Sequence, residues 1–209
     1  MTRRIPALAL FAIITGCSQR SPWVVVSSPS PVQQAEAVPG PATGPGAVPA
    51  APADATAVAH LNSLFFPVAG MDSTRLDDSF DDPRDGGVRK HQAIDIMAPR
   101  GSAVMAVQDG RILKLSKSAK GGTTVYATDL EEKFVYYYAH LDRYHGNVYA
   151  GRPLMRGDTI GYVGTTGNAP KNVPHLHFQV MRMPADRKYW SGEPINPYPL
   201  LRATSTASR

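Results

Sequence analysis

The sequence contains a single cysteine, Cys17, among its 209 residues, so no disulfide can form within the chain. It lacks the long apolar stretches of a polytopic membrane protein. Charge of one sign is only in small excess, with 22 Lys and Arg against 17 Asp and Glu, and the basic residues form no stripe of the kind that binds nucleic acid. These features favour one globular domain with some chain left over, and we expect no nucleic-acid partner.

An export signal opens the chain. Two arginines precede an apolar run over residues 5–14, which would be about 15 Å long as a helix and would cross only half of a bilayer. The run ends in Ile14-Thr15-Gly16-Cys17, which resembles the lipobox of bacterial lipoproteins. The resemblance implies a signal peptide over residues 1–16 and a membrane-anchoring lipid on Cys17. Because Ser18 and not Asp follows, it also implies the periplasmic face of the outer membrane.

Proline, alanine and glycine dominate the next segment. Between Pro29 and Ala59 there are seven Pro, ten Ala and three Gly, and large aliphatic or aromatic residues are almost absent. Such a composition cannot build a core. We therefore expect residues 17–60 to be a disordered tether, followed by a domain over residues 61–200 and a flexible tail over residues 201–209.

The remaining chain has short segments rich in β-branched and aromatic residues, each bounded by Gly or Asp. A periodicity of 3.6 residues is not sustained over 12 residues anywhere, so we expect no long helix. The predicted fold class is all-β, an antiparallel, sandwich-like β-sheet domain with a groove. The expected strands cover residues 104–107, 111–115, 123–128, 133–139, 159–163 and 175–183.

Two histidines share one face of the last of these strands. Alternation along the strand sends its apolar residues into the core, so His175 and His177 lie on the other face, about 7 Å apart. One imidazole could bind a metal while the other reaches a molecule bound to that metal. By itself the pair is a weak signal, because single histidines are commonly satisfied polar groups.

His91 and Asp95 form a second pair, four residues apart. In a straight strand their Cα atoms would be about 13 Å apart, too far for two ligands that each lie about 2.0 Å from one zinc ion. The backbone must therefore bend between them. Ile94, Ile96 and the nearby proline favour a loop or kinked strand over a helical turn.

His140 ends a third segment, which is rich in tyrosine. Strand alternation places it on one face with Tyr136 and Tyr138, and places Tyr137 and Ala139 on the other. Core packing is the expected role of Tyr136 and Tyr138, with a place in a substrate groove as the alternative.

In their order along the chain these segments resemble the lysostaphin/LytM-type zinc peptidase family, whose members cut peptide bonds within bacterial cell-wall peptidoglycan. The resemblance covers most of residues 80–197. It implies that zinc is the cofactor, and it assigns roles to five residues. The implied zinc ligands are His91, Asp95 and His177, and the implied catalytic histidines are His140 and His175. The motifs that carry it cover residues 95–104, 106–110, 138–141, 157–161 and 175–178.

One position departs from the family pattern. Ala93 stands at the centre of the motif that begins at His91 and ends at Asp95, where the family usually has glycine. Since alanine resists the dihedrals that glycine permits, we expect the bend between the two ligands to lie within ordinary φ/ψ space.

The implied ligand set, two imidazoles and one carboxylate, leaves a fourth position for water, as catalytic zinc sites do. His140 and His175 would then act as general base and acid, in an order that the sequence leaves open. The function implied is a zinc-dependent endopeptidase acting on the stem-peptide cross-links of peptidoglycan. Two alternatives stay open: a catalytically silent activator of a separate cell-wall amidase, with that amidase or an adaptor as its partner, and a zinc carboxypeptidase that trims free stem peptides.

Overall fold

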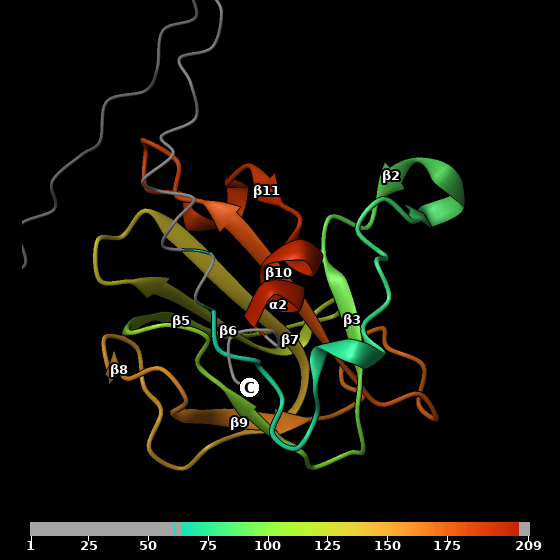
Figure 1. Ribbon diagram of the computed structural model, residues 1–209, viewed down its shortest axis with the longest axis horizontal. Coiled ribbons are helices and arrows are strands. Elements are labelled where there is room, and N and C mark those ends of the chain that lie inside the picture. The colour runs from blue at the N-terminus through green and yellow to red at the C-terminus, as the bar shows by residue number, and fades with distance from the viewer. Residues whose placement is uncertain (1–60, 62–63, 205–209) are drawn as a thin grey trace, which may run out of the picture. The chain divides into compact units, whose positions relative to one another are not determined.

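The computed structural model describes Leu61 and residues 64–204. The expected signal peptide, the expected lipidation site Cys17 and the expected tether lie outside these residues. The described part is nearly all β, which confirms the predicted fold class (Figure 1). Within residues 64–204, no helix has the length and apolar character needed to span a bilayer.

Nine strands form one antiparallel sheet, and two more form a small hairpin. The hairpin pairs β1 (Pro83–Arg84) with β2 (Arg89–Lys90). Within residues 64–204, the helical elements are three short 3-10 turns (Ser73–Arg75, Asp85–Gly87 and Tyr189–Ser191) and the helix α2 (Pro197–Thr204). The strands of the large sheet are β3 (Ile94–Met97), β4 (Ala103–Met105), β5 (Gly110–Ser118), β6 (Gly122–Asp129), β7 (Phe134–Tyr144), β8 (Pro153–Leu154), β9 (Thr159–Val163), β10 (His175–Arg182) and β11 (Pro194–Ile195).

Strand β7 organises the large sheet, whose main order is β11-β10-β7-β6-β5-β8. The first half of β7 pairs with β10, up to Ala139 opposite His177. Its second half, from Leu141 onward, pairs with β9, which in turn pairs with β4. His140 lies between the two pairings and has a φ of 60°. Strand β7 therefore changes its partner from β10 to β9 at this histidine.

One face of the sheet carries the core. Leu176, Phe178 and Val180 of β10 are fully buried on it, as strand alternation predicts. Helix α2 closes this face with Leu200 and Leu201 (Figure 1). Because Leu201 is buried within α2, the ordered domain continues past the boundary predicted at residue 200.

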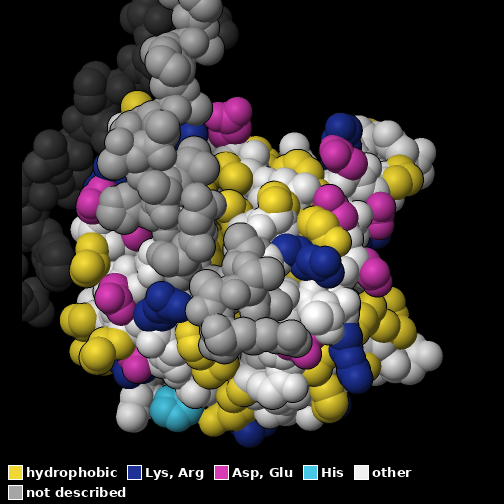
Figure 2. Space-filling view, viewed as in Figure 1, with side chains coloured by type: hydrophobic (Ala, Val, Ile, Leu, Met, Phe, Trp, Pro, Cys, Tyr) yellow, Lys and Arg dark blue, Asp and Glu magenta, His cyan; other side chains and the backbone are white. Residues whose placement is uncertain are grey.

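The opposite face of β10 carries His175, His177 and Gln179, since successive side chains of a strand alternate. Figure 2 views the molecule from the side of α2, and only a small patch of histidine surface, at the lower edge, is visible there. By strand alternation, His175 and His177 point away from the core side chains of β10.

Candidate metal centre

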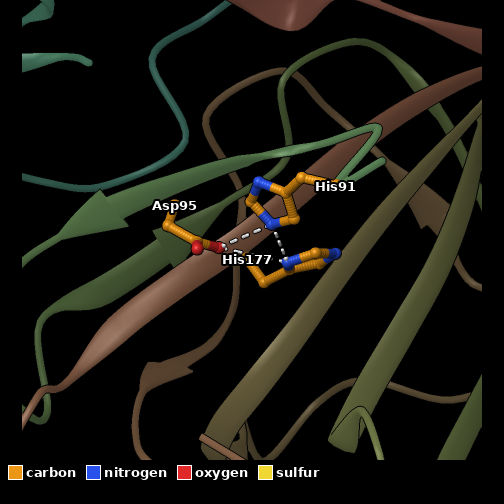
Figure 3. A group of neighbouring side chains, drawn as sticks. All are labelled: His91, Asp95 and His177. Carbon is orange, nitrogen blue, oxygen red and sulfur yellow. Dashed lines mark hydrogen bonds and ion pairs between the residues drawn. The ribbon is translucent and has the colours of Figure 1, made fainter. Parts of the chain in front are cut away.

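The three implied zinc ligands converge on the face of the sheet opposite α2. Asp95 of β3 and His177 of β10 are direct cross-strand partners, and His91 lies in the loop just before β3. The side chains point toward one another (Figure 3). His177 Nδ1 lies 3.0 Å from His91 Nε2 and 3.1 Å from Asp95 Oδ1, and His91 Nε2 lies 3.2 Å from Asp95 Oδ1.

A zinc ion fits this triangle of atoms. Ligands that each lie about 2.0 Å from a tetrahedral ion are about 3.3 Å from one another. The three observed separations, 3.0–3.2 Å, are close to that value. Within the described residues, this group of His91, Asp95 and His177 is the one whose donor atoms lie close enough together to hold a metal ion.

Gln92 makes the bend that brings His91 and Asp95 together. Its φ is 59°, in the left-handed region that residues other than glycine rarely adopt. The φ of Ala93 is not positive, and this residue is completely buried. The expectation of ordinary dihedrals is therefore correct at Ala93 and wrong for the bend as a whole. A hydrogen bond from the backbone N–H of Gln92 to the carbonyl of Phe80, 2.8 Å long, holds the bend in place.

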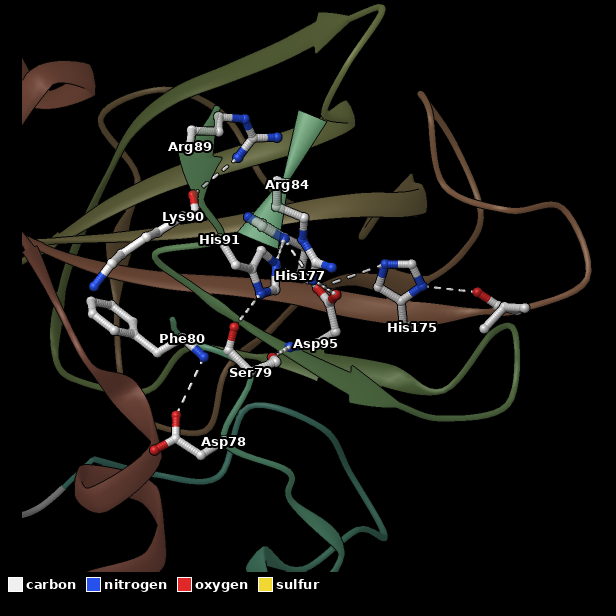
Figure 4. A network of polar contacts seen from close by, with 11 residues as sticks. Asp78, Ser79, Phe80, Arg84, Arg89, Lys90, His91, Asp95, His175 and His177 are labelled. Atoms are coloured by element: carbon white, nitrogen blue, oxygen red, sulfur yellow. Dashed lines mark hydrogen bonds and ion pairs between the residues drawn. The ribbon is translucent and has the colours of Figure 1, made fainter. Parts of the chain in front are cut away.

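Groups around the triangle fix the orientation of its ligands (Figure 4). The Nδ1 of His91 lies 3.0 Å from the carbonyl oxygen of Ser79. If this nitrogen carries the proton and donates it to the carbonyl, Nε2 keeps its lone pair for a metal. Arg84 Nη2 donates to Asp95 Oδ2 at 2.9 Å, so the two oxygens of this carboxylate face different partners.

The electrostatics of the triangle favour a charged Asp95 and neutral imidazoles. Burial alone would raise the pKa of Asp95, but the adjacent imidazoles of His177 and His91 outweigh it and hold the pKa of this carboxyl below its usual value. Burial lowers the pKa of His177, against the opposing effect of Asp95. An anionic carboxylate and neutral imidazoles are the forms that bind zinc.

The two implied catalytic histidines lie beside the triangle. The ring centroids of His140 and His175 are 5.0 Å apart, and that of His140 is 5.6 Å from the ring of His177. His175 Nε2 lies 3.8 Å from Asp95 Oδ1. All five residues that the sequence singles out are thus brought together.

Backbone carbonyls hold both of these histidines by the same ring nitrogen. His140 Nδ1 lies 2.9 Å from the carbonyl oxygen of Thr166, and His175 Nδ1 lies 2.8 Å from that of Val173. A proton on Nδ1 leaves Nε2 as the acceptor in each ring. Burial lowers the pKa of His140 to about 4, so this imidazole is neutral at neutral pH.

His140 does not lie on the face that strand alternation predicts for it. Tyr136 and Tyr138 are buried in the core, which confirms their expected role. His140 instead lines a pocket together with Tyr137 and Ala139. The cause is its positive φ, because a left-handed residue within a strand shifts the alternation of side chains by one position.

The pocket over the histidines has a volume of about 190 Å³. Besides His91, His140, His177 and Asn168, its lining includes polar and aromatic groups that were not predicted from the sequence: Arg89, Lys120, Tyr137 and Gln179. Gln179 was predictable, since it follows His177 by two residues on the same strand face. Arg89 and Lys120 come from loops and hairpins, where no sequence period indicates which way a side chain points.

Comparison with known proteins identifies similar sequences. The pattern of peptidase family M23 matches residues 89–197. The L-Ala–D-Glu endopeptidase of Bacillus subtilis is 32% identical over 123 residues, which are 56% of this chain and 36% of that protein. The peptidoglycan DD-endopeptidase ShyC of Vibrio cholerae is 32% identical over 99 residues, 47% of this chain and 22% of that protein. The chain thus spans about a third or less of the length of these relatives.

Solved structures share the fold. A protein from Ruminococcus gnavus named as a LytM-type glycyl-glycine endopeptidase aligns with a TM-score of 0.59 at 29% identity, over 73% of this chain and 65% of that one. Csd3 from Helicobacter pylori aligns with a TM-score of 0.51 at 29% identity, over 66% of this chain and 34% of that one.

Proposed function

The chain belongs to peptidase family M23, and on this premise we propose that it is a zinc-dependent endopeptidase that hydrolyses peptide cross-links of bacterial peptidoglycan. The observation that carries the proposal is the triangle of His91 Nε2, Asp95 Oδ1 and His177 Nδ1, with separations that suit one zinc ion. The names of the relatives, an L-Ala–D-Glu endopeptidase and a DD-endopeptidase, support the substrate class.

The ligands and the ion have distinct tasks in this proposal. His91, Asp95 and His177 hold the ion, and the hydrogen bond from Arg84 keeps the carboxylate of Asp95 turned toward the two imidazoles. Bound zinc would supply a Lewis acid that activates water and polarises the scissile carbonyl group.

His140 and His175 move the protons. Each is anchored through Nδ1 to a backbone carbonyl, so each presents Nε2 as a proton acceptor. A neutral imidazole can take a proton from the attacking water as general base, and a protonated one can give a proton to the leaving amine as general acid. Because His140 is neutral at neutral pH, it is ready to accept a proton before the reaction begins.

The pocket suits an acidic, extended peptide. Arg89 and Lys120 place two cations on its lining, and Gln179 and Asn168 add amide donors and acceptors. Carboxylates of peptidoglycan stem peptides would find charge-assisted partners there. This property does not separate an endopeptidase from a carboxypeptidase, so the test must identify the bond that is cut.

The test is a digest of purified sacculi with the zinc-loaded protein, analysed by mass spectrometry. We expect cross-linked muropeptide dimers to be converted to monomers, with the new ends at the cross-link. Loss of only a terminal residue from monomers would make the protein a carboxypeptidase. Intact cross-links together with stimulation of a purified amidase would replace the enzyme with an amidase activator.

We further propose that lipid on Cys17 anchors the protein at the periplasmic face of the outer membrane. The tether over residues 17–60 would then let the domain search the wall, over at most about 130 Å at about 3.1 Å per residue. Substituting Cys17→Ser should move the protein from the membrane fraction to the soluble fraction. Unchanged membrane association of this variant would contradict the anchor.

A further inference from the structure

A row of aromatic rings leads away from the metal centre. The ring centroid of Tyr137 lies 6.1 Å from that of His177, and the ring of Tyr126 lies 4.5 Å from Tyr137. Tyr189 follows at 5.1 Å from Tyr126, and Trp190 at 5.0 Å from Tyr189. We call Tyr137, Tyr126, Tyr189 and Trp190 the aromatic row. Its inner end, Tyr137, lies beside the candidate ligand His177, and its outer end, Trp190, lies at the surface.

The sheet and one connection build this row together. Tyr126 on β6 and Tyr137 on β7 are direct cross-strand partners, and Gln179 on β10 is the next partner across. Tyr189 and Trp190 belong to the 3-10 turn between β10 and β11. The turn therefore adds two aromatic rings to the pair that lies on the sheet.

Core packing does not account for the outer end of the row. The side chain of Trp190 is 59% exposed, whereas the tyrosines of the core, Tyr136 and Tyr138, are at most 2% exposed. Exposure alone does not mark a binding contact, but Trp190 continues a row of neighbouring rings that starts at the metal centre, and its ring remains available to a ligand. Tyr126 and Tyr137 are half-buried, so part of each also remains at the surface.

The row differs in charge from the pocket at its inner end. The pocket carries the cations Arg89 and Lys120, which suit an acidic peptide. The rings of the row carry no charge at neutral pH, and burial raises the pKa of Tyr126 and of Tyr137 further. Two surfaces of different chemistry thus adjoin, one for charged groups and one for neutral, partly apolar rings.

We propose that the aromatic row binds the N-acetylated amino sugars of the glycan strand that carries the stem peptide. Pyranose rings present apolar C–H faces that pack on Trp and Tyr, and their hydroxyl and acetamido groups remain hydrated at the edges. This inference rests on the proposed function, because it names a second part of the same substrate. It makes the glycan, and not the peptide alone, a determinant of which wall material is bound.

The length of the row suits this substrate. Its four steps of 6.1, 4.5, 5.1 and 5.0 Å place Trp190 at most about 21 Å from His177. An extended peptide of about five residues spans about 17 Å. A stem peptide whose scissile bond lies at the metal centre can therefore place its attached sugar over the outer end of the row.

The test measures sugar binding directly, without hydrolysis. In the full chain with Trp23→Phe, Trp190 is the only tryptophan, so its fluorescence reports on the row. We expect a saturable change of this fluorescence with a soluble, peptide-free tetramer of N-acetylglucosamine. By calorimetry, Trp190→Ala should raise the Kd of the tetramer about fivefold to tenfold, and Trp190→Phe should raise it less.

Tyr149→Ala is the matched control, because Tyr149 is 60% exposed and lies outside the row. It should leave the Kd unchanged. No binding of the tetramer by the parent, or equal Kd values for Trp190→Ala and Tyr149→Ala, would overturn the proposal.

Hydrolysis separates this proposal from the proposed function. The ratio of turnover on intact sacculi to turnover on cross-linked peptides freed from glycan should fall about fivefold in Trp190→Ala and stay constant in Tyr149→Ala. An equal ratio in both variants would overturn the glycan contact. A parent protein that cleaves neither substrate would refute the endopeptidase, while the binding of the tetramer would still decide the role of the row.

Discussion

Arg84 donates a hydrogen bond of 2.9 Å from Nη2 to Oδ2 of Asp95, while Oδ1 of the same carboxylate faces His91 and His177. The hairpin of β1 and β2 carries Arg84 to this position, with Arg84 opposite Arg89 in its register. The arginine is thus a positioning residue, because it holds the carboxylate in the orientation that directs one oxygen to the metal centre.

Removing the arginine should weaken metal binding. We expect Arg84→Ala to lower the affinity for zinc about 10- to 100-fold, and Arg84→Lys to lower it less, as measured by competition with a chromophoric chelator. Arg89→Ala is the control, since Arg89 lies in the same hairpin and pairs with Asp85 instead. Equal zinc affinities for Arg84→Ala and Arg89→Ala would show that the hydrogen bond to Asp95 has no such role.

Substitutions of His177 and of His140 should affect metal binding differently, although both should reduce turnover. His177→Ala removes a ligand and should lose both zinc and activity. His140→Ala should keep about one zinc ion per chain and lose turnover by about 100-fold or more, because it removes a proton acceptor and leaves the ligands in place. The readouts are metal analysis and muropeptide turnover, with His145→Ala as a histidine control outside the cluster. Loss of zinc from His140→Ala would contradict the division of roles.

The pH dependence of stability should reflect the burial of His140. Burial lowers its pKa to about 4, whereas an unfolded histidine titrates near pH 6.5. Between pH 4 and 6.5 the unfolded chain therefore binds more protons than the folded one. The contribution of neutral His140 to the free energy of unfolding is complete above about pH 6.5 and is lost as the pH falls toward 4. In urea denaturation of the metal-free protein, the free energy of unfolding should decrease less between about pH 6.5 and pH 4 in His140→Gln than in the parent. Identical decreases would show that His140 does not titrate differently on unfolding.

The bend before β3 gives a paired prediction on stability. Gln92→Gly should raise the free energy of unfolding by about 0.5–1 kcal/mol, because glycine adopts a φ of 59° without strain. Ala93→Gly should lower it by about 1–2 kcal/mol, because it removes a buried methyl group and adds freedom to the unfolded chain. Chemical denaturation of both variants without metal checks this. If Gln92→Gly lowered the free energy of unfolding and Ala93→Gly raised it, the left-handed residue would have to be at position 93.

Much of the fold and site was predictable from local patterns. The alternation in β10 predicted that Leu176 and Phe178 would be buried and that His175 and His177 would share the other face. The six expected strands correspond to β4, β5, β6, β7, β9 and β10, with differences at their ends. A period of two residues is a strong signal because it directly reflects which face of a sheet is buried.

Features that depend on backbone irregularity or on tertiary packing were not predictable. The left-handed dihedrals of Gln92 and His140 break the period, so alternation placed His140 on the wrong face. The two-residue strands β1, β2, β8 and β11 are too short to show a period at all. The position of Tyr189 beside Tyr126 depends on how the turn between β10 and β11 folds over the sheet, which no local pattern specifies.

Anomalous X-ray diffraction at the zinc edge, from crystals grown with zinc, tests the central claim most directly. The account predicts one strong anomalous peak, about 2.0–2.2 Å from each of His91 Nε2, Asp95 Oδ1 and His177 Nδ1. A peak elsewhere in the molecule, or no peak within reach of these three atoms, would contradict it.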